Sequence, residues 1–147
     1  MPEASDITEI RHAVRQLCAK FGESYWLELD RDRGYPTEFV QALTESGFLP
    51  VLIPEAYGGS GLGVYEASII MEEVCRAGAH AGACHAQMYV MGSVLRHGSE
   101  AQKQYYLPKI AAGELRLQSF GVTEPTTGTD TTSLKTTARL DGDHYVV

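Results

Sequence analysis

Residues 120–130 read FGVTEPTTGTD and bring together groups that could hold a polar ligand. Glycines let backbone N–H groups come close to a ligand, and threonine hydroxyls can bond phosphates and ring heteroatoms. The segment contains no lysine or arginine, so an anion held here would need further neutralisation from elsewhere. The same residues also fit an exposed, hydroxyl-rich β connection in which Asp130 caps a turn. Physical chemistry alone leaves both interpretations open.

Other stretches that could carry chemistry are better explained by structure. His80 and Cys84 are spaced like two metal ligands on a helix, but no second pair and no flanking carboxylate supports them. Residues 57–63, YGGSGLG, lack the third glycine and the βαβ context of a dinucleotide loop. No serine has the surroundings of a nucleophile elbow. We therefore predict no metal site, no hydrolase chemistry, and a turn between helices at 57–63.

The elements that would position residues 120–130 are mostly helical. Apolar residues recur at helical spacing and predict five or so helices over residues 6–113, including segments at 64–77 and 82–97. Pro108 should restart or kink the last helix. Two pairs have the spacing of helix caps: Asp6 with Glu9, and Ser99 with Gln102.

The pattern changes after Leu115. Apolar and polar residues alternate, β-branched residues dominate from 122 to 137, and TTARLDGDHYVV is typical of strand, Asp-Gly turn and strand. The chain ends at Val147 inside an apolar run, which we interpret as truncation. The predicted fold is mainly α: a helical bundle domain over residues 1–117, followed by an incomplete β-domain segment over residues 118–147.

Composition and charge indicate which partners and which cellular compartment to expect. The chain has 147 residues, a formal net charge of −7 and three cysteines without framework spacing. The acidic charge argues against nucleic acid and anionic membranes as partners, and the odd cysteine count favours reduced thiols. Neither a signal peptide nor an apolar run long enough for a membrane span is evident in the sequence. We expect a cytoplasmic protein.

Residues 120–130 resemble the flavin-contact signature of the acyl-CoA dehydrogenase family, in which V/L-T-E-P is followed by two small residues and G-S-D. Four other stretches also resemble family segments in order and spacing: GFLPVLIPEAYGGSGL, MEEVCRAGA, HGSEAQKQYYLPKIAAGE and LDGDHYVV. The resemblance implies the N-terminal helical bundle and the first strands of the middle β domain of that family. It also implies FAD as cofactor and an acyl-CoA as substrate.

The resemblance assigns cofactor contacts to five residues: Phe120, Val122, Thr123, Gly128 and Thr129. Thr129 would also lie near the acyl-CoA. Thr126 and Thr127 stand where the family usually has Gly-Ala, which stiffens the loop with β-branched residues. Thr129 stands in place of serine, which keeps the hydroxyl and adds a methyl group.

A second set of substrate contacts is predicted on one helical face, formed by Gly82, His85, Ala86 and Tyr89. In the family a helix in this region flanks the acyl tail. The bulky, polar-tipped His85 and Tyr89 favour a short, branched or ring-bearing acyl group. Plain core packing is the alternative.

The implied reaction is desaturation of an acyl-CoA thioester between its α and β carbons. A carboxylate base removes the α proton while a hydride moves from the β carbon to FAD. The family's base is a glutamate far toward the C-terminus, so no residue here receives a catalytic role, and Glu124 belongs to the cofactor segment. We expect this chain alone to be inactive and to hold FAD weakly or not at all.

The resemblance further implies an electron-transfer acceptor and a homo-oligomer for the parent enzyme. Two other interpretations remain open. One is an acyl-CoA oxidase or flavin monooxygenase on the same fold. The other is a helical interaction module without chemistry.

Overall fold

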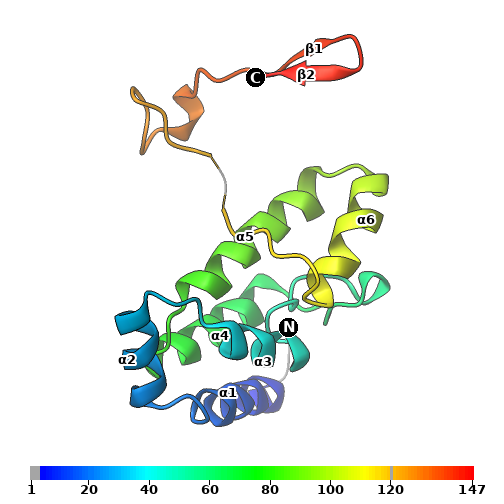
Figure 1. The fold of residues 1–147 in the computed structure, drawn as a ribbon. Helices are drawn as coiled ribbons and strands as arrows, with labels where there is room; N and C mark the ends of the chain where they lie inside the picture. The colour runs from blue at the N-terminus through cyan, green and yellow to red at the C-terminus, as the bar shows by residue number, and fades with distance from the viewer. Residues whose placement is uncertain (1–3, 120) are drawn as a thin grey trace.

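The computed structural model describes residues 4–119 and 121–147, and Figure 1 shows a helical body with the C-terminal segment extending away from it. The described residues contain six α-helices: α1 (Ala4–Cys18), α2 (Glu23–Asp32), α3 (Thr37–Glu45), α4 (Val64–Arg76), α5 (Gly82–His97) and α6 (Glu100–Ala111). Two short 3-10 turns are η1 (Glu55–Tyr57) and η2 (Thr131–Ser133), and the strands are β1 (Arg139–Asp141) and β2 (His144–Val146). The prediction of a mainly α fold is confirmed.

One apolar core joins the helices. Side chains with less than 2% exposure come from five of them: Val14 in α1, Phe39 and Leu43 in α3, Ile70 in α4, Met91 in α5 and Leu107 in α6. Each such side chain contributes about 1.5–3 kcal/mol when it leaves water. Because buried residues recur every three or four positions, each of these five helices presents one apolar stripe to the others. This stripe is the periodicity visible in the sequence.

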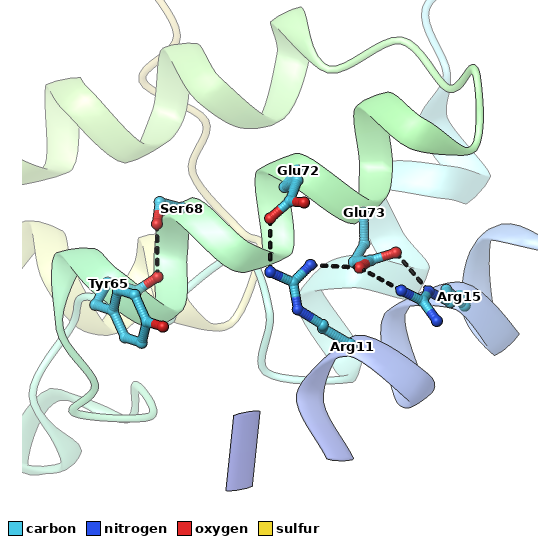
Figure 2. Close-up of polar contacts among 6 residues, drawn as sticks. All are labelled: Arg11, Arg15, Tyr65, Ser68, Glu72 and Glu73. Carbon is cyan, nitrogen blue, oxygen red and sulfur yellow. Dashed lines mark hydrogen bonds and ion pairs between the residues drawn. The ribbon is translucent and has the colours of Figure 1, made fainter. Parts of the chain in front are cut away.

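Helices α1 and α4 are also joined by ion pairs around a buried carboxylate (Figure 2). Glu73 has no exposed side-chain surface and accepts from Arg11 Nη1 at 2.5 Å and from Arg15 Nε at 2.6 Å. The hydrogen bonds from Arg15 and Arg11 outweigh the effect of burial and lower the pKa of Glu73 to about 2. Arg11 also reaches Glu72 at 2.7 Å. Glu73 is therefore an ionised structural residue.

The glycine-rich segment 57–63 is a turn between η1 and α4, as the sequence predicted. Gly61 has φ +64° and donates its N–H to the Ile53 carbonyl at 2.8 Å. A Cβ on Gly59 would lie 2.1 Å from that same carbonyl oxygen. These glycines are required for close packing of the turn.

Three helices differ from what the sequence indicated. Helix α1 includes Ala4, so Asp6 lies inside the helix and does not cap its start. Helix α6 continues through Pro108 and does not restart there, because a proline near the end of the helix removes only one backbone donor. Helix α2 was not predicted as a helix. The Ser99–Gln102 capping box is confirmed, with Gln102 N–H donating to Ser99 Oγ at 3.2 Å.

The expectation of strands throughout 118–147 was only partly correct. Within the described residues, β1 and β2 are the only strands, and they pair antiparallel from Arg139↔Val146 to Asp141↔His144. Gly142 has φ +63° in the turn between them. All residues of both strands are exposed, so the hairpin has no apolar face covered by another element.

Among the described residues, no helix combines the length and apolar character needed to cross a membrane.

Candidate functional site

Residues 122–136 form a loop that is held by its own hydrogen bonds. Glu124 and Thr127 exchange backbone bonds of 2.9 and 3.1 Å, which closes a tight turn around Pro125. Thr127 is buried at 8% exposure, and its hydroxyl donates to the Ser133 carbonyl at 3.3 Å. The threonine at a usual glycine or alanine position thus packs inside the loop.

Two carboxylates fix the rest of the loop. Glu124 accepts from the backbone N–H groups of Thr136 at 2.6 Å and of Lys135 at 2.8 Å. Asp130 accepts from the Ser133 and Thr132 hydroxyls and from the Thr132 N–H. Bonds to Thr136 lower the pKa of Glu124, and bonds to Ser133 and Thr132 lower the pKa of Asp130. Both groups are ionised structural acceptors at neutral pH.

The predicted cofactor contacts lie on the open surface of this loop, except Phe120, which lies outside the described residues. Thr123, Gly128 and Thr129 are exposed and Val122 is half-buried. A Cβ on Gly128 would meet no atom within 4 Å. Within the described part of the chain, the N–H groups of Gly128 and Thr129 and the Thr123 hydroxyl have no hydrogen-bond partner. The loop therefore presents donors that are free to bind a ligand rich in acceptors.

The predicted acyl-tail face on α5 divides into two parts. Gly82 and Ala86 line a cavity of about 560 Å³. His85 and Tyr89 are exposed, and their rings meet edge to face with centroids 5.0 Å apart. The structure thus places the two small residues at a cavity and the two bulky ones outside its lining.

The other wall of this cavity comes from α2 and the residues after it, including Trp26, Arg33 and Tyr35. Sequence reasoning missed this wall because α2 was not predicted. The available signal was the cluster of aromatic residues at 25, 26 and 35. A second cavity, of about 670 Å³, lies on another side of Trp26, between α1 and α4, and contains none of the predicted site residues.

The cavity and the loop are connected through Gln118. Its side-chain amide donates to the Ala83 carbonyl in α5 at 2.7 Å and to the Tyr35 hydroxyl at 2.8 Å. Gln118 therefore fixes the chain against α5 shortly before the loop begins, and it lines the cavity itself.

Comparison with known proteins finds a matching family and similar chains. Residues 4–114 match the family described as acyl-CoA dehydrogenase, N-terminal domain. The acyl-CoA dehydrogenase FadE12 of Mycobacterium tuberculosis is 34% identical over 146 residues, which are 99% of this chain and 37% of that protein. The probable acyl-CoA dehydrogenase FadE25 of the same species is 39% identical over 149 residues, covering 100% of this chain and 37% of that protein. The chain thus spans little more than a third of these relatives.

Two solved structures are similar over almost the whole chain. The acyl-CoA dehydrogenase of Geobacillus kaustophilus has a TM-score of 0.83 and 30% identity, covering 99% of this chain and 38% of that one. The acyl-CoA dehydrogenase of Bacillus anthracis complexed with FAD has a TM-score of 0.79 and 31% identity, covering 98% of this chain and 25% of that one.

Proposed function

The chain belongs to the acyl-CoA dehydrogenase family, and we propose that it is the N-terminal part of an FAD-dependent enzyme that desaturates an acyl-CoA thioester between the α and β carbons. In this proposal residues 1–117 are the helical domain and residues 118–147 begin the β domain. The observation that carries it is the set of unused donors on the loop at Thr123, Gly128 and Thr129.

The loop fits the proposed cofactor in chemistry and in space. The flavin ring offers carbonyl oxygens and ring nitrogens, which are acceptors for the N–H and O–H donors of Thr123, Gly128 and Thr129. The open space around Gly128 allows a ring to approach the backbone. With Val122, these are the described residues that would hold FAD. When bound, FAD supplies the acceptor for the hydride that leaves the β carbon.

Other residues of the chain would position the substrate and the loop. The small residues Gly82 and Ala86 leave room beside α5 for the acyl group, and the Thr129 hydroxyl lies on the same loop as the flavin contacts. Glu124 is not the base, because its carboxylate is occupied by the N–H groups of Lys135 and Thr136. The base, an electron-transfer acceptor and the partner subunits of a homo-oligomer would be supplied by the longer protein and its partners.

The test uses a fusion of this chain to the remaining part of FadE25, beside the 147-residue chain alone. We expect the fusion to purify with FAD and to reduce an artificial electron acceptor when given an acyl-CoA. We expect neither property in the chain alone. A fusion that binds FAD but oxidises no acyl-CoA would refute the proposed reaction, and hydrogen peroxide formed in step with product would identify an oxidase instead.

A matched pair of variants tests the loop. Thr123→Val removes one free donor, and we expect FAD binding in the fusion to weaken by about tenfold, as for the loss of one hydrogen bond. Thr126→Val makes the same change at an exposed threonine of the same loop that is not among the predicted contacts. Equal effects of both variants on FAD binding would contradict the assignment.

A further inference from the structure

The cavity beside α5 has walls of two different kinds. On one side Trp26 and Tyr35 supply aromatic side chains. On the other side Gly82, Ala83 and Ala86 carry at most a methyl group, so the surface of the helix there is nearly bare. Such a space, between aromatic rings and a smooth helix surface, is suited to a broad, flat and apolar group.

These walls are fixed in place before any ligand binds. The Trp26 indole N–H donates to the Phe21 carbonyl at 3.0 Å, and its ring packs edge to face against Phe39 with centroids 5.0 Å apart. The Tyr35 hydroxyl and the Gln118 amide bond each other. In a preformed cavity, little free energy is lost to ordering the side chains when a ligand binds.

The volume indicates the size of the group. An apolar protein cavity of about 150 Å³ holds one benzene ring, whereas this cavity measures about 560 Å³. It therefore has room for several fused rings. A straight alkyl chain would leave most of the width empty and lose the corresponding van der Waals contacts. Polar side chains line the cavity too, at Asp30, Arg33 and His80, so the far edge of a ligand would meet polar groups.

We propose that this cavity receives the distal part of a fused-ring acyl group, so that the preferred substrates are CoA thioesters of polycyclic acids. The inference rests on the proposed function, because Gly82 and Ala86 belong both to the cavity and to the helix face that would flank the acyl tail. It goes further by assigning α2 and the residues after it to substrate selection.

Trp26 is the only tryptophan of the chain and lines the cavity, so its fluorescence reports on occupancy. The 147-residue chain is titrated with 1-pyrenebutyryl-CoA, whose four fused rings absorb tryptophan emission, and decanoyl-CoA is added as a competitor. We expect saturable quenching, and a Kd for the pyrene thioester at least about tenfold below that of decanoyl-CoA. Equal affinities, or no quenching at all, would overturn the proposal.

Two variants on α5 locate the binding. In Gly82→Val the added side chain enters the cavity, where even a Cβ would meet the His80 ring at 2.9 Å. We expect its Kd for the pyrene thioester to rise about tenfold or more. Gly92→Val places the same side chain where a Cβ meets no atom within 4 Å, and the Kd should stay unchanged.

Unchanged quenching in Gly82→Val would place the ligand in the other cavity beside Trp26 and overturn the proposal. The proposed function would survive that result, because flavin retention and oxidation of straight-chain thioesters by the fusion are measured separately.

Discussion

Replacing Glu73 by glutamine tests whether the ion pairs between α1 and α4 stabilise the helical body. The Glu73 side chain is fully buried, whereas the Arg15 side chain is 51% exposed. Lowering the carboxyl pKa from 4.5 to about 2 corresponds to about 3 kcal/mol, at about 1.36 kcal/mol per pH unit. Solvent around Arg15 screens part of this, and glutamine keeps the shape of the side chain. We expect the free energy of unfolding to fall by about 2 kcal/mol near neutral pH.

The pH dependence gives a second readout with a defined sign. The carboxyl pKa is lower in the folded chain than in the unfolded chain, so the stabilisation is complete above the unfolded value and is lost as the pH falls toward 2. Thermal unfolding followed by circular dichroism should show the variant about 8 °C below the wild type near neutral pH, at about 4 °C per kcal/mol. The two curves should converge as the pH falls from about 5 to about 2.

Glu72→Gln is the matched control. Glu72 neighbours Glu73 on the same helix, but its side chain is 56% exposed, and it bonds Arg11 at 2.7 Å. Its replacement should change the free energy of unfolding by no more than about 0.5 kcal/mol. Equal losses in the two variants, or a Glu73→Gln loss that stays constant down to about pH 2, would refute the reasoning.

Three further predictions concern the turn, the thiols and the loop. Gly59→Ala places a Cβ 2.1 Å from the Ile53 carbonyl oxygen, so urea unfolding should show a loss of about 2 kcal/mol or more, and an unchanged midpoint would contradict the packing. A thiol reagent should modify the exposed Cys75 in the native chain and reach Cys84 only on unfolding, because burial raises the pKa of Cys84 to about 12; equal rates would disprove this. Glu124→Ala should speed amide hydrogen exchange at the two N–H groups bonded by the carboxylate, and the wild type should match it only below the lowered pKa of Glu124; exchange that is the same in both chains at neutral pH would exclude the loop-holding role.

Most helices were predictable because each carries a continuous apolar stripe into one core. Helix α2 was not, and the reason is physical. Tyr25, Trp26 and Leu29 have helical spacing, but the helix has only ten residues and none of them is buried. Its position depends on contacts with another helix, chiefly the edge-to-face packing of Trp26 on Phe39 of α3. A helix held mainly through its aromatic side chains leaves only a weak pattern in its own sequence.

The strand prediction for residues 118–147 was only partly correct, for a different reason. Alternation and β-branched residues express a preference that becomes a strand only when another strand pairs with it. Within the described residues that condition is met across the Asp-Gly turn, where β1 and β2 meet. Elsewhere the segment forms turns, and Thr127, which counted toward strand propensity, packs inside the loop.

The candidate site, too, could be predicted from the sequence only in part. Resemblance picked out Thr123, Gly128 and Thr129, but it assigned Glu124 only to the cofactor segment. The carboxylate acts on backbone groups 11 and 12 residues further along the chain, a contact that no local pattern contains. The cavity likewise combines α2 with α5, which are separated by two other helices in the sequence.

The loop at 122–136 and the cavity beside α5 are each well formed, but few contacts connect them. Among the described residues, the hydrogen bonds of residues 121–147 stay within that segment, which extends away from the helical body in Figure 1. The body holds the approach to the loop through Gln118 and through Arg116, which donates to the Thr44 hydroxyl at 3.0 Å. Catalysis requires cofactor and thioester to be aligned within a fraction of an ångström. A loop whose approach is held only by these two residues cannot supply that alignment, so we expect the 147-residue chain to bind acyl groups at α5 while remaining inactive and poor in FAD.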